Sequence, residues 1–365
     1  MPVQARNISA AGLLPNPVWR SYLGGSVLRA FRGCKGTADD HFPEDWLAST
    51  VLARNCKHSQ GPSEGVSALK TDDSSHMLPK LLVEEPGFWF GRGSDRSGGE
   101  GTGVLWKLLD SSARLQIQAH PDRAFAKRHL NSDKGKTECW HILSTRGEGH
   151  VYLGFQKQPT RSAWGQMIQD QNVDGMLACF EEISVKAGET YVVPAGTPHA
   201  IGAGVFMLEL QEPTDWVVRC ETVNAGLTLP PEACFMGLNL ETCLEVFDFE
   251  DWPIKKVRDQ LQQRTTTIVN ASSYREEELI SPEFHEFFRL HGLRGSGEAS
   301  WRGNELMLLI VLDGKASLDS GTDLRRVQRG ETWLLPGAAE RWRWVEPQGD
   351  WEILLAKLPI APKQQ

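Results

Sequence analysis

One seven-residue pattern occurs twice in this chain of 365 residues. Gly188-Glu-Thr-Tyr-Val-Val-Pro194 recurs 142 positions later as Gly330-Glu-Thr-Trp-Leu-Leu-Pro336. Repetition at this distance indicates two copies of one supersecondary unit. Many short strand-like segments separated by glycine and proline accompany the repeat, among them residues 138–143 and 150–155, which we interpret as paired strands. We therefore expect a mainly β protein built from two antiparallel sandwiches or barrels.

The two copies differ where the first carries a metal-competent side chain. His199 follows the opening glycine of the first copy by eleven residues, and the same offset in the second copy falls on Arg341. We therefore expect a metal-binding catalytic domain over residues 1–250. Residues 251–365 should form a degenerate second barrel that binds no metal and acts structurally.

Three helical segments interrupt the strands. Residues 160–180 are rich in tryptophan, methionine and other apolar residues, and we expect two short helices there that cover one end of the first barrel. A proline near the start and apolar residues at 254, 257 and 261 predict a connecting helix over residues 252–263. A third helix is expected over residues 122–130, with Asp122 as its cap.

Composition excludes several classes of protein. The formal net charge is -8, and no run of lysine and arginine is long enough to track a phosphate backbone, so we expect no binding to nucleic acid. No apolar stretch is long enough to span a membrane, and the N-terminus lacks the order of a signal peptide. The seven cysteines form no CxxC pair, which fits reduced thiols and a cytoplasmic protein.

Candidate metal ligands recur with a spacing of two residues. Gln118 and His120 share one face of a predicted strand, because successive side chains point to opposite sides. Lys136 and Glu138 repeat this spacing, and His199 follows a tight turn. One amide oxygen, two imidazoles and one carboxylate suit zinc or another divalent ion, one per chain, with room for water or substrate.

These segments together resemble the type I mannose-6-phosphate isomerases of the cupin superfamily. The resemblance covers roughly residues 16–220 and rests on four motifs in the order of that family, Gln118-Ala-His120-Pro-Asp, Gly135-Lys-Thr-Glu138-Cys-Trp, Gly196-Thr-Pro-His199-Ala-Ile-Gly and Asp215-Trp-Val-Val-Arg219. It implies a bicupin, that is, two antiparallel jelly-roll β-barrels, and a zinc-dependent enzyme that interconverts mannose 6-phosphate and fructose 6-phosphate through a cis-enediol.

The resemblance also implies roles for individual residues. Gln118, His120, Glu138 and His199 would be the metal ligands, and Lys136 and Arg219 would be catalytic residues, with the acidic Asp215 nearby. Their chemistry fits the reaction, in which a base moves a proton between neighbouring carbons while a divalent metal stabilises the enediolate. A lysine beside a divalent cation gives up its proton more readily, so Lys136 is the candidate base or proton donor. Arg219 keeps its charge and is expected to stabilise the oxyanion.

Two departures from the family pattern concern the substrate. Members usually have serine at the position of Gln116 and lysine at the position of Ala225, both associated with the sugar phosphate group. We therefore expect weaker selectivity for phosphorylated over free sugars, unless Lys136, Arg219 or the glycine-rich segment 91–103 holds the phosphate instead.

Three alternatives remain at the level of sequence. Instead of a mannose-6-phosphate isomerase, the protein could be an isomerase of free sugars, a non-catalytic sugar sensor or an iron dioxygenase. The dioxygenase is disfavoured because only two histidines are present in the ligand set. The expected partner is a small sugar or sugar phosphate. The sequence does not determine the oligomeric state, and a monomer is compatible with it.

Overall fold

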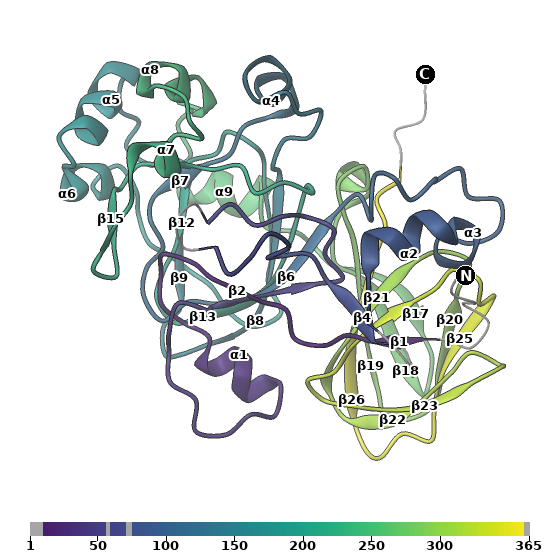
Figure 1. Ribbon diagram of the computed structural model, residues 1–365. Helices are drawn as coiled ribbons and strands as arrows, with labels where there is room; N and C mark the ends of the chain where they lie inside the picture. The colour runs from purple at the N-terminus through teal and green to yellow at the C-terminus, as the bar shows by residue number, and fades with distance from the viewer. Residues whose placement is uncertain (1–9, 56–58, 71–74, 361–365) are drawn as a thin grey trace.

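The computed structural model describes residues 10–55, 59–70 and 75–360, and two β-sandwiches lie side by side in it (Figure 1). The strands within each sheet are antiparallel, so the predicted mainly β, antiparallel architecture is confirmed. Residues 1–9, where we expect no signal peptide, and Cys56 lie outside the described residues. Within them, Cys34 is exposed and the other five cysteines are buried as free thiols.

The first sandwich consists of a six-stranded and a five-stranded sheet. The six-stranded sheet has the order β11-β8-β13-β6-β3-β2, and the five-stranded sheet has the order β10-β9-β12-β7-β14. The strands of the first sheet are β2 (Pro17–Val18), β3 (Glu44–Leu47), β6 (Leu105–Asp110), β8 (Glu138–Thr145), β11 (Thr190–Val193) and β13 (Val205–Gln211). Those of the second are β7 (Gln118–Ala119), β9 (His150–Leu153), β10 (Ile183–Ser184), β12 (His199–Ile201) and β14 (Val218–Arg219).

The second sandwich pairs a seven-stranded sheet with a four-stranded one. Their orders are β1-β24-β21-β26-β19-β18-β17 and β20-β25-β22-β23. The seven strands are β1 (Ala11–Gly12), β17 (Thr266–Asn270), β18 (Tyr274–Glu278), β19 (Arg289–Gly295), β21 (Met307–Asp313), β24 (Thr332–Leu335) and β26 (Trp351–Lys357). The four are β20 (Ala299–Arg302), β22 (Lys315–Asp319), β23 (Leu324–Gln328) and β25 (Arg341–Val345).

The strand registers relate the two sandwiches in the way that the sequence repeat predicts. Strand β11 pairs with β8 as β24 pairs with β21, so the repeat aligns Val193 with Leu335. The residue opposite Val193 is Glu138, and the residue opposite Leu335 is Met307. Strands β12 and β25 likewise begin at His199 and Arg341. The second sandwich therefore has neither the carboxylate nor the histidine at these two equivalent positions.

The six-stranded sheet buries apolar side chains on both faces because it packs against two partners. One face, including Trp140 and Met207, shares a buried cluster with Val151 and Ile201 of the five-stranded sheet. The opposite face shares another buried cluster with the seven-stranded sheet, composed of Trp106, Leu108, Leu208, Leu210, Leu308, Ile310, Leu334 and Leu354 among others. The two sandwiches are thus joined by a common hydrophobic core.

The N-terminal part of the chain contributes to both sandwiches. Strand β1 pairs with β24, and the backbone N–H of Gly337 donates to the carbonyl of Trp89 at 2.8 Å. The division at residue 250 stays a prediction, although these contacts add early residues to the second sandwich.

Helices cover the outer face of the five-stranded sheet. From the sequence we expected them at one end of the barrel instead. Helices α5 (Arg161–Gln169) and α6 (Val173–Leu177) bury Trp164 and Met176 against Ile117 and Val218 of that sheet. The expected connecting helix is confirmed as α9 (Ile254–Gln260), and the third helix is confirmed as α4 (Arg123–Leu130). The Asp122 side chain accepts a hydrogen bond from the N–H of Phe125 at 2.7 Å, as a cap does.

The remaining elements are short and lie mainly at the periphery. They are α1 (Ser26–Phe31), α2 (Leu78–Glu84), α3 (Pro86–Trp89), α7 (Pro231–Cys234), α8 (Leu240–Cys243), the 3-10 turns η3 (Leu244–Val246) and η4 (Pro282–Phe284), and the two-stranded pairs β4 (Ala68–Lys70) with β5 (Ser75–Met77) and β15 (Val223–Asn224) with β16 (Leu227–Thr228). None of the helices in the described ranges is long and apolar enough to serve as a membrane span.

The pairing expected between residues 138–143 and 150–155 is wrong. Strand β8 pairs with β11 and β13, whereas β9 pairs with β10 and β12 in the opposite sheet. The turn between them therefore connects the two sheets of the first sandwich, and consecutive strands face each other across its core.

Candidate metal centre and substrate cavity

Three predicted ligands meet inside the first sandwich. Their ligand atoms, from His120, Glu138 and His199, all lie within 4.8 Å of one another, and all three residues are buried. The Nε2 atom of His120 lies 3.0 Å from Oε1 of Glu138, and Nε2 of His199 lies 3.7 Å from Oε2. The ligands come from both sheets, since β8 carries the carboxylate and β12 carries His199.

Backbone carbonyls orient both imidazoles. Nδ1 of His120 lies 2.9 Å from the carbonyl oxygen of Trp216, and Nδ1 of His199 lies 2.8 Å from that of Thr197. A proton on Nδ1 satisfies each carbonyl and leaves the Nε2 lone pair directed into the cluster, the arrangement common among metal-binding histidines. Burial lowers the pKa of both rings, that of His120 to about 3. Both imidazoles are therefore neutral at physiological pH, which is the form that binds metals.

Glu138 has the properties of a metal ligand. Its Oε2 accepts a hydrogen bond from the indole N–H of Trp140 at 3.1 Å. Its Oε1 is buried and accepts no hydrogen bond of good geometry from the described residues, although Lys136 Nζ lies 3.1 Å and His120 Nε2 3.0 Å from it, within ion-pair distance. Burial opposes ionisation of the carboxyl, but His120 and Lys136 outweigh it and hold the pKa of Glu138 well below its usual value. The donor set therefore fits a divalent metal.

Gln118 lies beside this cluster, as predicted. Its β7 position pairs with His199 on β12 and with Arg219 on β14. Its amide nitrogen lies 3.2 Å from Nε2 of His199. Rotation of the amide group exchanges the positions of its nitrogen and oxygen, and it then presents the oxygen to the cluster as a fourth donor.

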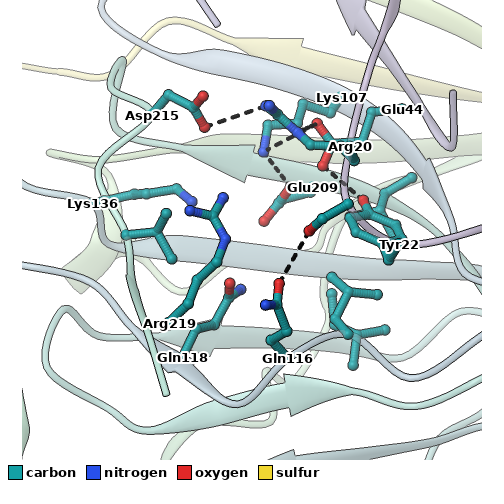
Figure 2. A pocket seen from close by; sticks show the side chains of 15 residues that line it. Arg20, Tyr22, Glu44, Lys107, Gln116, Gln118, Lys136, Glu209, Asp215 and Arg219 are labelled. Atoms are coloured by element: carbon teal, nitrogen blue, oxygen red, sulfur yellow. Dashed lines mark hydrogen bonds and ion pairs between the residues drawn. The ribbon is translucent and has the colours of Figure 1, made fainter. Parts of the chain in front are cut away.

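A cavity opens next to the cluster, and Figure 2 shows its lining side chains. Gln118, Lys136, Asp215 and Arg219 all line it, which brings the predicted catalytic residues together. Lys136 Nζ lies 3.1 Å from Glu138 Oε1. We expected the side chains of residues 215, 217 and 219 to point to one side of their segment, toward the site. All three line the cavity, which agrees with that expectation.

Arg219 is half-buried and is not held by a carboxylate among the described residues. Its Nη1 donates to the carbonyl oxygen of Ala233 at 2.7 Å. Asp215 instead binds Arg20, at 3.2 Å between Oδ1 and Nη2. Burial lowers the pKa of Arg219 from its ordinary value, although Asp215 counteracts part of that effect. The guanidinium therefore remains available to a negative charge that appears in the cavity.

Buried charged side chains that bind one another form another part of the cavity wall, and no sequence pattern identifies them as a unit. Glu44 accepts hydrogen bonds from Arg20 Nε at 2.9 Å and from the Tyr22 hydroxyl at 2.7 Å. Lys107 Nζ donates to Glu209 Oε2 at 2.8 Å. A sequence feature that could have indicated this network is a charged residue inside each of two otherwise largely apolar strands, Lys107 in β6 and Glu209 in β13.

Glu209 differs from the other carboxylates of this wall. Burial, reinforced by the charge of Glu138, raises the pKa of Glu209 to about 7, although Lys107 acts against this rise. In contrast, the pKa of Glu44 is lowered to about 2, because Arg20 and Lys107 together outweigh burial. Glu209 is therefore a group of this cavity that can hold or release a proton at neutral pH.

The two departures from the family pattern have structural explanations. Gln116 is locked in place, since its Nε2 donates to the carbonyl of Glu221 at 2.6 Å and its Oε1 accepts from the Ser21 hydroxyl at 3.1 Å. A serine hydroxyl thus lies beside position 116, although it comes from a different segment. Ala225 lies in the turn between β15 and β16 with a φ of 46°, and it brings no cation to the cavity.

Curated relatives of this chain are mannose-6-phosphate isomerases. No family model matches the chain. The probable mannose-6-phosphate isomerase GmuF of Bacillus subtilis is 38% identical over 234 residues, which are 64% of this chain and 69% of that protein. The mannose-6-phosphate isomerase ManA of the same organism is 28% identical over 236 residues, with the same two coverages.

Solved structures agree with this relationship at the level of the fold. The crystal structure of mannose 6-phosphate isomerase from Bacillus subtilis matches with a TM-score of 0.73 at 21% identity, covering 96% of this chain and 100% of that one. A phosphomannose isomerase variant from Salmonella typhimurium matches with a TM-score of 0.70 at 15% identity and the same coverage.

Fold and site together define a protein of two antiparallel β-sandwiches with a candidate metal centre, formed by two histidines and a glutamate, in the first of them. Within that class, the extent and identity of the match to GmuF decide the relationship. The chain belongs to the mannose-6-phosphate isomerase family.

Proposed function

We propose that this protein is an aldose–ketose isomerase that interconverts mannose 6-phosphate and fructose 6-phosphate through a cis-enediol with the help of one bound divalent metal, zinc being the first candidate. The observation that carries the proposal is the buried cluster of His120, Glu138 and His199 at the edge of a cavity that Lys136 and Arg219 also line. The neutral imidazoles and ionised carboxylate supply a donor set of the right charge for such an ion.

The metal would be held by His120, Glu138 and His199, with Gln118 as the fourth ligand. When bound, it supplies a Lewis acid that lowers the energy of the enediolate by several kcal/mol. Two imidazoles, one carboxylate and one amide leave room in the coordination sphere of zinc for substrate or water.

The proton is moved by groups that lie beside this centre. Lys136 Nζ, 3.1 Å from Glu138, is our first candidate to take the proton from the carbon next to the carbonyl and return it to the neighbouring carbon. Glu209 lines the same cavity, and its raised pKa makes it a candidate for the accompanying transfer between the two oxygens. Arg219 is assigned to the negative charge that develops on the enediolate oxygen.

The functional alternatives differ in their substrate and in turnover. An isomerase of free sugars would convert mannose as readily as its phosphate, and a sugar sensor would bind without converting either. A cytoplasmic location and a monomeric enzyme remain predictions that rest on the sequence alone.

The decisive experiment is to incubate the metal-loaded protein with mannose 6-phosphate and, separately, with mannose, and to measure the ketose formed. We expect turnover of the phosphorylated sugar that is lost after chelation and restored by added zinc. A Glu138→Gln variant should lose activity and metal together, whereas His129→Ala, a change on the surface helix α4, serves as the matched control. Binding without ketose formation in every metal-loaded sample would contradict the proposal.

A further inference from the structure

A second cavity adjoins the first, and the two share lining residues. Its volume is about 400 Å³, and Arg20, Ser21 and Arg219 line both cavities. Three arginines, Arg20, Arg54 and Arg219, contribute to the outer cavity, and no aspartate or glutamate occurs among its described lining residues. In a protein with a net charge of -8, such a cavity favours an anionic ligand.

The three arginines are not equivalent. Arg20 is buried and already binds two carboxylates, Glu44 at 2.9 Å and Asp215 at 3.2 Å, so its charge is balanced within the protein. Arg219 lies at the boundary between the two cavities. Arg54 is the arginine that lines the outer cavity alone.

Arg54 is held in a defined orientation. Its guanidinium carbon lies 3.6 Å from the centroid of the Trp216 ring, which is the geometry of a stacked cation–π contact. Its backbone N–H donates to Oδ2 of Asp215 at 2.7 Å. Stacking engages the face of the guanidinium, and its N–H groups lie in the plane of that group, where they can bind two oxygens side by side.

The same tryptophan connects Arg54 to the metal centre. The carbonyl oxygen of Trp216 lies 2.9 Å from Nδ1 of His120, which orients that ligand. The position of Arg54 is therefore fixed relative to the centre by one residue, Trp216, whose ring contacts the arginine and whose backbone contacts the histidine.

We propose that Arg54 is a specificity-determining residue that binds the phosphate group of the sugar substrate in the outer cavity. The proposal rests on the proposed function. Arg54, which follows β3 in the chain, would supply the positive charge that family members usually have at the position of Ala225. The carbonyl end of the sugar reaches the inner cavity past Arg219, while the phosphate stays against the stacked guanidinium. The apolar part of the wall, which includes Leu229 and Pro230, lowers the local dielectric on one side of the charge pair and strengthens it.

The test compares Arg54→Gln with the wild-type enzyme on mannose 6-phosphate and on mannose. The ratio of kcat/KM for the phosphorylated sugar to that for the free sugar should fall by about 10- to 100-fold, as expected for the loss of a charge-assisted contact. The loss should appear mainly in KM. Arg54→Lys keeps the charge without the planar fork and should be intermediate, which also covers the case that the glutamine variant folds poorly.

Arg329→Gln is the matched control, because Arg329 is also an exposed arginine near an aromatic ring, 5.7 Å from the centroid of Phe31, but lies in the second sandwich. An unchanged ratio in both Arg54 variants, or an equal fall in the control, would overturn the proposal.

A binding measurement separates this proposal from the proposed function. If the wild type converts neither sugar, the isomerase assignment fails, and Arg54 is then tested by calorimetry with mannose 6-phosphate as the probe. Weaker binding by about 10-fold or more in Arg54→Gln would support the phosphate site even then. Equal affinity in wild type and variant would refute it whatever the activity.

Discussion

Replacing Glu44 by glutamine should destabilise the protein strongly at neutral pH and much less in acid. The carboxylate of Glu44 is buried between Arg20 and Lys107 and accepts hydrogen bonds from Tyr22 and Trp46. Burial raises its pKa, but the two cations and the hydrogen bonds outweigh burial and lower the pKa from 4.5 to about 2. At about 1.4 kcal/mol per pKa unit, this depression corresponds to roughly 3 kcal/mol of stability.

The sign of the pH dependence follows from the direction of that shift. Because the folded-state pKa is below the unfolded-state value, the contribution of Glu44 is fully present above pH 4.5 and is lost as the pH falls toward 2. The Glu44→Gln variant should thus lose about 3 kcal/mol of unfolding free energy at pH 7, and about half as much at pH 3. The loss also includes the cost of leaving Arg20 with Asp215 and Lys107 with Glu209 as their remaining buried carboxylates.

Urea unfolding at pH 7 and pH 3, with fluorescence as the readout, measures both values. Glu298→Gln, which changes an exposed carboxylate on the second sandwich, is the control and should have little effect at either pH. A Glu44 variant whose destabilisation is the same at both pH values would show that the ionised carboxylate is not what stabilises the network.

Three further predictions concern the site and the second sandwich. The purified protein should contain about one divalent metal per chain, and elemental analysis should find it absent from a His120→Ala/His199→Ala double variant but retained in His129→Ala; undiminished metal in the double variant would remove the cluster from consideration. Crystals soaked in zinc should show an anomalous peak in the first sandwich only, since a peak beside Arg341 would mean that the second sandwich also binds metal. Arg219→Ala should lower kcat and kcat/KM together by about 100-fold or more with metal content unchanged; a rise in KM alone would assign the residue to substrate binding, and normal kinetics with a lower Tm would make it structural.

Local spacing was sufficient to predict most of the candidate site. Gln118 with His120 and Lys136 with Glu138 are pairs two residues apart, and alternation alone puts the members of each pair on one side of an extended segment. His199 required more, because its distance in sequence says nothing about proximity. The resemblance to a family whose motifs occur in the same order supplied that information, and the cluster in the structure agrees with it.

The buried charge network could not be predicted in the same way. Arg20, Glu44, Lys107 and Glu209 come from separate segments that meet only after β3, β6 and β13 have paired in a particular register. The incorrect pairing of residues 138–143 with 150–155 has the same origin. Two apolar runs joined by a short turn fit a hairpin within one sheet equally well as a connection between two sheets, and only the packing of the whole sandwich distinguishes them.

Strand β1 has a consequence for the order in which this chain folds. Ala11 pairs with Leu334, and the N–H of Leu13 donates to the carbonyl of Thr332 at 2.9 Å, so the first described strand finds its partner only after most of the described residues have been synthesised. At ribosomal rates of about 5–20 residues per second, these partners emerge roughly tens of seconds apart. During that interval, the face of the six-stranded sheet that belongs to the common core has no cover. Contacts between residues so far apart in sequence form slowly. During this time we expect chaperones that bind exposed apolar sheet surface to bind the nascent chain.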